Sequence, residues 1–226
     1  MPESLYIADL EHCGGDPVQR ILLHLREPYT FRAGQYLQVQ APDGTQIPLS
    51  IASAPTRLPE LELHYRSTPA SPEAQIMDVL LTGSTLTVTR AVGDVRCGAP
   101  NQALFIVAGG SGIAQAFSCA EYRHATKAPA PATILWCADQ PGDIYQIELL
   151  QSYGPVDLHV ITDDRRTADN EGMVWLAQHC RNYSQAYVVL AGGPGFVYAA
   201  TDVLLAAGFK SDQLHADVYA YAPREL

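Results

Sequence analysis

The sequence predicts a two-domain protein, in which an antiparallel β-barrel over residues 1–98 precedes a doubly wound parallel α/β domain over residues 99–226. The length of 226 residues exceeds that of a usual single domain. Short alternating segments fill the first part of the chain, whereas continuous apolar runs separated by helix-length segments fill the second. The pattern changes at Gly98-Ala99-Pro100, which places the boundary there.

The barrel is predicted from segments in which apolar and polar residues alternate between turn residues. In one of them Leu61, Leu63 and Tyr65 alternate with Glu62 and His64, which is the pattern of a half-buried strand. Six such strands within about 95 residues are typical of a small antiparallel barrel. They are expected at residues 4–10, 18–25, 35–40, 46–52, 60–65 and 85–90.

One helix is expected within the barrel half. Ser71-Pro72-Glu73 supplies an N-cap, a first-turn proline and an early acid, and the helix ends by Gly83.

The second half is predicted to be α/β because its apolar runs indicate strands that are buried on both faces, as in parallel sheets. Helix-length segments separate the runs, so a doubly wound sheet follows. Polar loops are expected at residues 125–131 and 163–172. The five strands are expected at residues 103–108, 132–138, 156–162, 186–191 and 216–221.

Composition excludes several classes of function. Hydrophobic residues make up 47% of the chain and charged residues 17%, which provides a core and gives no sign of disorder. The formal net charge of -10 argues against a nucleic-acid or anionic-membrane partner. The opening MPESLYIADLEHCGG does not resemble a secretory signal, and no apolar run approaches the roughly 20 residues of a membrane helix. A cytoplasmic protein is therefore expected.

Five cysteines are scattered along the chain without a CxxC pair. Zinc and iron–sulfur sites need clustered thiolates, so neither site is expected, and a disulfide framework is not expected either. The seven histidines show no ligand spacing, so no metal site is expected. The cysteines are interpreted as small buried hydrophobic residues in a reducing compartment. They are Cys13, Cys97, Cys119, Cys137 and Cys180.

Two glycine-rich turns each follow a predicted strand and open a helix. Glycine permits a sharp turn and a close approach to a ligand, and the helix N-terminus presents unpaired N–H groups to a phosphate. Either turn alone is also consistent with a tight α/β turn that binds nothing. Two of them at the carboxyl ends of strands in one sheet indicate a ligand-binding crevice. The turns are Gly109, Gly110, Ser111 and Gly112, and Gly192, Gly193, Pro194 and Gly195.

The order of these motifs resembles that of the ferredoxin–NADP reductase superfamily and, within it, of the bacterial NAD(P)H:flavin oxidoreductases. The barrel half carries FRAGQYL at 31–37 and PLSIAS at 48–53. The α/β half carries VAGGSG at 107–112, AGGPG at 191–195 and the closing ADVYAYA at 216–222. The resemblance runs essentially from end to end. It implies a flavin-binding barrel, a nicotinamide-binding α/β domain and hydride transfer from NADH to flavin.

The resemblance also implies roles for individual residues. Pro48, Leu49 and Ser50 would lie along the flavin ring, with the Ser50 hydroxyl at N5, the atom that accepts hydride. The first glycine turn would hold the nicotinamide nucleotide, and the second would lie beneath the nicotinamide. The protein would act by positioning, while the flavin supplies the chemistry.

Three departures from the family refine these expectations. Ile47 replaces the arginine that usually steadies the flavin, which puts flavin affinity and activity in question. The barrel helix begins with SPEA at 71–74, whereas relatives that retain FAD carry a GxxS turn there that binds the pyrophosphate. In this respect the chain resembles the flavin reductases, which use FMN, FAD or riboflavin as an exchangeable substrate. Asp139 stands where relatives that accept NADPH often carry a basic residue, and a carboxylate favours the ribose 2′-hydroxyl of NADH.

Three more residues have two interpretations each. Arg66 follows the ELHY strand and is either a ligand for an FMN phosphate or an exposed arginine at a strand end. Tyr219 and Tyr221 lie in the predicted terminal strand and either face the flavin or belong to the core.

Three functions remain open on the sequence. The first is an NADH-dependent flavin reductase, which supplies reduced flavin or electrons to a partner oxygenase. The second, suggested by Ile47, is a flavin- and nucleotide-binding module without turnover. The third is an electron-transfer subunit that retains FAD and reduces an iron–sulfur protein.

Overall fold

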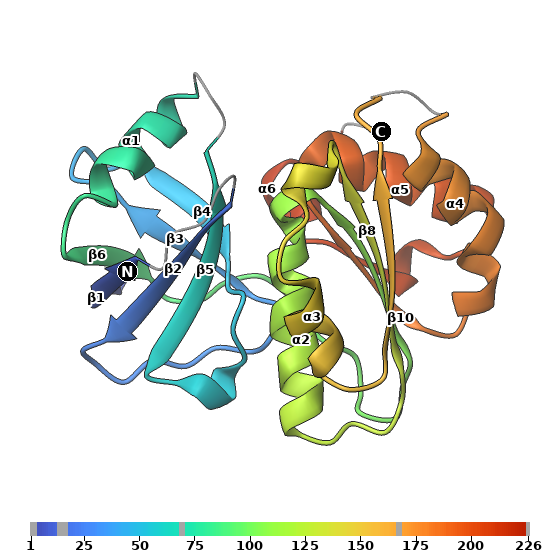
Figure 1. The fold of residues 1–226 in the computed structure, drawn as a ribbon, viewed down its shortest axis with the longest axis horizontal. Helices are drawn as coiled ribbons and strands as arrows, with labels where there is room; N and C mark the ends of the chain where they lie inside the picture. Colours follow the sequence, from blue (N-terminus) through green and yellow to red (C-terminus); the bar gives the residue numbers. More distant parts are fainter. Residues whose placement is uncertain (1–3, 13–17, 68–70, 166–168, 225–226) are drawn as a thin grey trace.

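The structure, a computed structural model, describes residues 4–12, 18–67, 71–165 and 169–224. It contains a six-stranded antiparallel sheet and a five-stranded parallel sheet, which lie side by side in Figure 1. The predicted fold class is confirmed. The boundary at residue 98 falls in the segment 90–103 that connects the two sheets, and it stays a prediction. Within the described residues, no helix is long and apolar enough to cross a membrane.

The antiparallel sheet curls into a nearly closed barrel. Its strand order is β4-β3-β6-β1-β2-β5, and a bridge between Ile51 and Leu63 brings the two edges together. Ile21, Leu37 and Val88 are fully buried inside the barrel. The strands are β1 (Leu5–His12), β2 (Val18–Leu25), β3 (Tyr36–Gln40), β4 (Gln46–Ser50), β5 (Glu60–Arg66) and β6 (Thr85–Thr89).

The barrel helix, α1 (Pro72–Leu80), begins where the sequence predicts. The backbone N–H of Ala74 donates to Oγ of Ser71 at 3.0 Å, which caps the helix. Met77 is fully buried and packs against the barrel core.

The parallel sheet has the order β11-β10-β7-β8-β9. Strands β7, β8 and β10 are buried almost throughout, as predicted, whereas the residues of the edge strand β9 are half-buried or exposed. On β7, Ile106 packs in the core that includes α2 and α3, and Phe105 packs in the core that includes α4 and α5. The strands are β7 (Leu104–Gly109), β8 (Ala132–Ala138), β9 (Val156–Thr162), β10 (Tyr187–Ala191) and β11 (Leu214–His215). The helices are α2 (Ile113–Ala125), α3 (Ile147–Ser152), α4 (Glu171–His179), α5 (Pro194–Ala206) and α6 (Val218–Tyr221).

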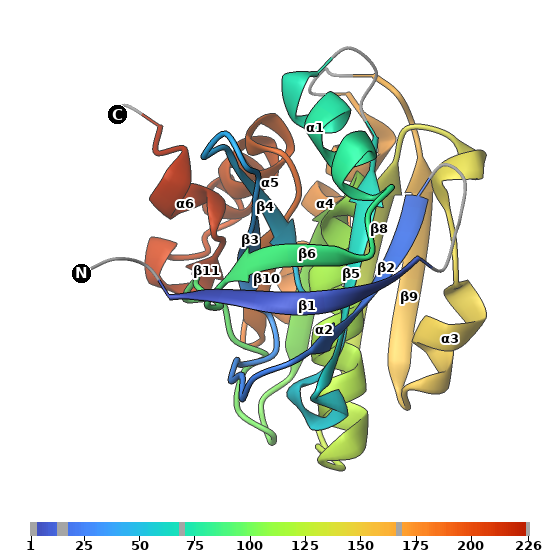
Figure 2. The same ribbon diagram turned by 90° about the vertical axis from the view of Figure 1, so that its left-hand side faces the viewer.

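Helix α2 lies between the barrel and the parallel sheet (Figure 1). The Oγ of Ser118 donates to the carbonyl of Ser53 at 2.7 Å, which ties the helix to the barrel. Figure 2 looks onto the barrel and shows β1 and β6 in front of α2. The helix therefore contacts both halves of the molecule.

The predicted strand at 216–221 is wrong. The fifth strand is the short β11, and α6 follows it. In a strand Tyr219 and Tyr221 would share a face, but here Tyr219 contacts α5 and Tyr221 contacts Tyr36 of the barrel. The chain turns because Gln115 of α2 binds the carboxylate of Asp217 and holds it in the interface between the two halves.

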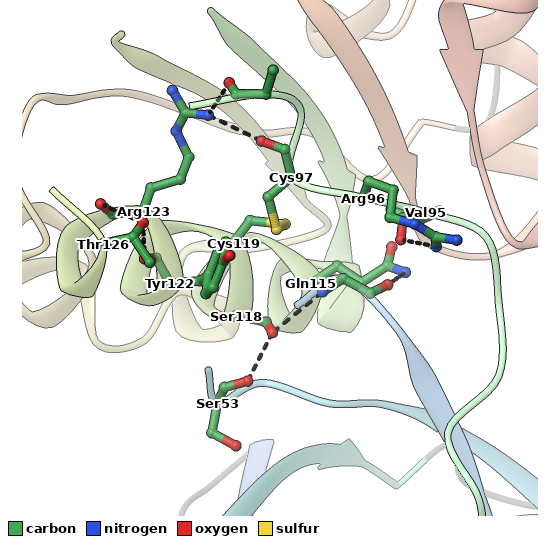
Figure 3. Close-up of a disulfide and its surroundings, with 12 residues drawn as sticks. Ser53, Val95, Arg96, Cys97, Gln115, Ser118, Cys119, Tyr122, Arg123 and Thr126 are labelled. Carbon is green, nitrogen blue, oxygen red and sulfur yellow. Dashed lines mark hydrogen bonds between the residues drawn. A yellow bond between two sulfur atoms is a disulfide. The ribbon is translucent and has the colours of Figure 1, made fainter. Parts of the chain in front are cut away.

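The expectation for the cysteines is wrong at two positions. Cys97 of the connecting segment and Cys119 of α2 form a disulfide, with 5.2 Å between their Cα atoms (Figure 3). Residues 22 apart in sequence meet because the connecting segment runs along α2. Cys137 and Cys180 are free and buried, as expected, whereas Cys13 lies outside the described residues.

Strand β5 also differs from expectation, because both of its faces are buried. Leu61 and Leu63 point into the barrel, while Glu62 and His64, each 4% exposed, lie on the face turned toward the α/β half. His64 contacts Phe117 of α2 edge-on, with ring centroids 5.2 Å apart. The alternating pattern predicted that this face of β5 is exposed to solvent, but the α/β half packs on it and buries it.

Candidate functional site

A small pocket opens where the barrel, the parallel sheet and α6 meet. β4 contributes Pro48 and Ser50, and the glycine turn after β10 contributes Gly192. The structure thus brings together the strand and the second glycine turn that the sequence singled out. The other lining residues are Tyr36, Gln115, Leu190, Ala191, Asp217, Val218 and Tyr221.

Pro48 and Ser50 reach this pocket because the side chains of β4 alternate. Ile47 is 5% exposed in the barrel core, and Leu49 packs partly against the same core. β4 is an edge strand that pairs with β3 on one side only, so the backbone N–H and C=O groups of its outer edge have no strand partner. Ile47, which stands at the family's arginine position, is therefore a core residue.

The two glycine turns pack against each other, backbone to backbone. A Cβ on Gly112 would lie 2.6 Å from the backbone of Ala191, and one on Gly192 would lie 3.0 Å from the carbonyl oxygen of Gly109. Glycine is therefore required at these positions by the approach of one turn to the other. The positions where a Cβ would meet open space are Gly110, Gly193 and Gly195.

The helices that follow these turns leave their N-termini without side-chain caps. Gly112 is the N-cap of α2 and Gly193 that of α5, and neither helix has a side-chain cap hydrogen bond. Backbone N–H groups at such ends suit an anion such as a phosphate. Asp139 follows β8, the neighbour of β7, so it lies along the same carboxyl edge of the sheet and is partly buried there.

Asp217 is a site residue that the sequence interpretation missed. Nε2 of Gln115 donates to its Oδ2 at 2.6 Å and to the carbonyl of Gly34 at 2.8 Å. Its Oδ1 is buried without a hydrogen-bond partner among the described residues. Burial raises the pKa of the carboxyl to about 6, although the hydrogen bond from Gln115 acts to lower it. A carboxyl group with a raised pKa in a cleft is a candidate functional group.

A signal for Asp217 existed in the sequence, because an aspartate directly before VYAY is also typical of a helix start. The strand interpretation of residues 216–221 concealed it. Gln115 carried no signal, since its two partners are distant in sequence.

Two tyrosines flank the carboxyl group. The rings of Tyr36 and Tyr221 meet edge-on, with centroids 6.4 Å apart. Burial and the charge of Asp217 raise the pKa of both hydroxyls. Tyr219 does not reach the pocket, because its hydroxyl lies 2.6 Å from Oγ1 of Thr201 on α5.

Arg66 lies apart from the residues that line this pocket. Its NH2 is 2.8 Å from Oδ1 of Asp143, in the turn η3 (Pro141–Asp143) of the α/β half. The side chain of Asp143 is 1% exposed, and that of Arg66 is 27% exposed. The role of Arg66 toward a flavin phosphate stays a prediction.

No family model matches the chain. It is 29% identical to the terephthalate 1,2-dioxygenase reductase component 2 of Comamonas sp. over 217 residues, which covers 89% of this chain and 64% of that protein. It is also 29% identical to a probable flavin reductase of Vibrio harveyi over 218 residues, which covers 89% of this chain and 93% of that protein. The chain thus spans slightly less than two thirds of the dioxygenase reductase component and nearly all of the flavin reductase.

Solved structures share the fold at low sequence identity. The ferredoxin reductase in carbazole 1,9a-dioxygenase superposes with a TM-score of 0.79 at 18% identity, over 96% of this chain and 70% of that chain. The ferredoxin-NADP+ reductase of Plasmodium falciparum gives 0.77 at 13% identity, over 95% of each chain. The chain therefore has the fold of ferredoxin–NADP reductase-type proteins and is a homologue of proteins named flavin reductase.

Proposed function

We propose that this chain is an NADH-dependent flavin reductase that passes hydride from the nicotinamide to an exchangeable flavin. One observation carries the proposal: Pro48 and Ser50 of β4, the second glycine turn and Asp217 line one pocket. The similarity to a probable flavin reductase over 93% of its length supports it.

The residues around the pocket fit a flat ring and a nucleotide. The outer backbone edge of β4 can pair with the polar edge of a ring, and the open space at Gly110 and Gly193 leaves room for a phosphate at uncapped helix ends. The Asp217 carboxyl, held by Gln115, adds a polar group to the lining of the pocket. A bound flavin and NADH would supply the acceptor and the donor of hydride.

The roles of the chain's own residues follow from this arrangement. The hydroxyl of Ser50, which lines the pocket, would donate to the reacting edge of the ring. The Asp217 carboxyl, with its pKa raised to about 6, can hold a proton near neutral pH, and Gln115 orients it. Asp139 would accept from the ribose 2′-hydroxyl of NADH and repel the 2′-phosphate of NADPH.

Weak retention of the flavin tail is supported by the start of α1. Ser71 already caps this helix, Pro72 occupies its first position, and Glu73 adds a negative charge there. This end therefore disfavours a pyrophosphate. We infer that riboflavin, FMN or FAD binds as a substrate instead of as a retained group.

The named relatives also suggest an acceptor for the electrons. Two of them are reductase components of a terephthalate dioxygenase, and another is the reductase subunit of an aromatic O-demethylase. We propose that an oxygenase partner in the cytoplasm receives the reduced flavin or its electrons.

The test is a steady-state assay of NADH oxidation with riboflavin, FMN and FAD, each over a range of concentrations. Saturable turnover with at least one added flavin is expected. If NADH is not oxidised with any of the three flavins, the reductase is rejected and a binding module is favoured. Turnover that needs no added flavin would favour a reductase subunit with retained FAD.

A further inference from the structure

Strand β5 of the barrel reaches across to the segment 139–146, which follows β8 in the α/β half. NH2 of Arg66 lies 2.8 Å from Oδ1 of Asp143, and Nδ1 of His64 lies 2.9 Å from the hydroxyl of Tyr145. The spacing matches, because residues two apart on β5 meet residues two apart on the segment. We call these two contacts the β5 clamp.

The Arg66–Asp143 contact is energetically important because the carboxylate is buried. The carboxylate of Asp143 is 1% exposed, and neither of its oxygens has a hydrogen bond of regular geometry among the described residues. A buried carboxylate without a compensating charge is costly. The Arg66 guanidinium supplies that charge and is therefore committed to Asp143.

The other half of the clamp is anchored on the outer face of the barrel, which is turned toward the α/β half. Nε2 of His64 lies 3.0 Å from Oε1 of Glu62, which also accepts from Arg20 at 2.7 Å, while its Oε2 accepts from Arg57 at 2.9 Å. Burial acts to raise the pKa of Glu62, but the hydrogen bonds from His64, Arg20 and Arg57 outweigh it and hold the pKa well below its usual range. Glu62 thus fixes the His64 ring through Nε2, while Nδ1 contacts Tyr145.

The clamped segment leads to the nucleotide edge of the site. The ring of Tyr145 meets Trp136 of β8 edge-on, with centroids 5.3 Å apart. Nε1 of the fully buried Trp136 donates to the carbonyl of Gly110 in the first glycine turn at 3.1 Å. Asp139 is the first residue of the segment. Side chains of the barrel are therefore connected to both the glycine turn and Asp139.

We propose that Arg66 and His64 are positioning residues for the nicotinamide nucleotide. Through Asp143 and Tyr145 they fix the segment 139–146, and so the place of Asp139 and the first glycine turn. The proposal rests on the proposed function, because it concerns the nucleotide of that reaction. It competes with a role for Arg66 as the ligand of an FMN phosphate, which would leave the Asp143 carboxylate buried and unpaired.

Arg66→Met separates the two roles. We expect the KM for NADH to rise about tenfold with kcat changed less than about twofold, and the preference for NADH over NADPH to narrow. The dissociation constants of riboflavin and FMN should stay unchanged. Arg26→Met is the matched control, because Arg26 forms an exposed ion pair with Asp9 on the barrel and should leave every constant as in the wild type.

Tyr145→Phe guards against a variant that fails to fold, since it removes one hydroxyl and keeps the ring. It should raise the KM for NADH by about threefold. Amide hydrogen exchange provides a readout that needs no turnover. Exchange within residues 139–146 should accelerate in both variants and remain unchanged in Arg26→Met.

Weakened FMN binding in Arg66→Met, with riboflavin binding and the KM for NADH unchanged, would overturn the clamp in favour of the phosphate role. A fall in kcat alone, or unchanged exchange in 139–146, would overturn it too. If the wild type itself does not oxidise NADH, the proposed function is wrong, and so is the role of Arg66 and His64 toward the nucleotide. Hydrogen exchange then still decides whether β5 holds the segment.

Discussion

Ser50 and Asp217 approach one pocket from opposite halves of the molecule. Ser50 ends β4, where its side chain alternates away from the barrel core, and Asp217 is held by Gln115 just before α6. A hydroxyl and a carboxyl group that share a pocket can place a proton beside a reacting atom. Each of the two therefore leads to a measurable expectation.

Ser50→Ala should lower kcat far more than it weakens flavin binding. Its hydroxyl is expected to act where charge develops during the reaction, and such an interaction strengthens only in the transition state. We expect kcat to fall about a hundredfold while the flavin dissociation constant changes less than about threefold. An equal loss in both would show that the hydroxyl contributes to binding alone.

Asp217→Asn should stabilise the protein above pH 6. The pKa is raised from 3.8 to about 6 in the folded protein, so the folded state binds more protons than the unfolded state between these values. The stability of the wild type therefore falls as pH rises from about 4 to about 6, by about 2 kcal/mol once partial solvation is allowed for. The asparagine variant escapes this loss. Urea unfolding should give a more stable variant at pH 7.5 and equal stabilities near pH 4, and a constant difference would contradict the raised pKa.

Asp139→Arg should narrow the preference for NADH. For the wild type we expect kcat/KM to be about tenfold or more higher with NADH than with NADPH, equivalent to roughly 1.4 kcal/mol. The arginine removes a repulsive carboxylate and adds a cation for the 2′-phosphate. Equal efficiency of the wild type with the two nucleotides would refute the role of Asp139.

At the scale of elements, α2 joins the halves of the protein. Its first turns follow the glycine turn, and polar side chains farther along the helix bind the barrel and the connecting segment. NH1 of Arg123 donates to the carbonyl of Cys97 at 3.0 Å, and Oε2 of Glu121 accepts from the backbone N–H of Ala54 at 2.6 Å (the Arg123 contact is drawn in Figure 3). The helix whose N-terminus is proposed to bind a phosphate therefore also fixes the barrel against the sheet.

The disulfide between Cys97 and Cys119 should stabilise this junction. It closes a loop over a sequence separation of 22 residues, for which chain entropy predicts about 3 kcal/mol. Reduction should lower the free energy of unfolding of the wild type by that amount. The double variant Cys97→Ala/Cys119→Ala should not respond to reductant. Thiol titration of the denatured protein should count two more free thiols after reduction than before it, and an equal count would contradict the bridge.

At the scale of the whole molecule, the two sheets form the pocket between them, and the capped, acidic start of α1 disfavours a pyrophosphate. On the proposed function, β4 would hold the flavin ring, and the tail would be largely unbound. We therefore expect an exchangeable flavin with a dissociation constant in the micromolar range, near -8 kcal/mol. Extensive dialysis should therefore yield a colourless protein. One FAD per chain after dialysis would make the flavin a retained group.

Ile47 bears on the same question. Its side chain fills the barrel core, so the module without turnover does not follow from it alone. An arginine there would have to place its charge among apolar residues or distort β4. The absence of the family's cation is thus consistent with a site that binds the ring through backbone groups.

Sequence by itself determined the two halves of the fold. Alternation of apolar and polar residues located the barrel strands, and continuous apolar runs located strands β7 to β10. The burial of a strand dictates which of its positions must be apolar. Turn and cap residues located α1 and both glycine turns. These patterns are local, so each can be recognised before the chain folds.

Only the tertiary structure decided what lies between the halves. The burial of Glu62 and His64, the Arg66–Asp143 pair and the approach of Asp217 to Gln115 join residues that no local pattern relates. The strand predicted at 216–221 became α6 for the same reason, because its aspartate binds a helix more than a hundred residues earlier in the chain. From its sequence pattern, a polar side chain is predicted to be solvent-exposed. Only long-range packing determines whether another element covers it, and which element that is.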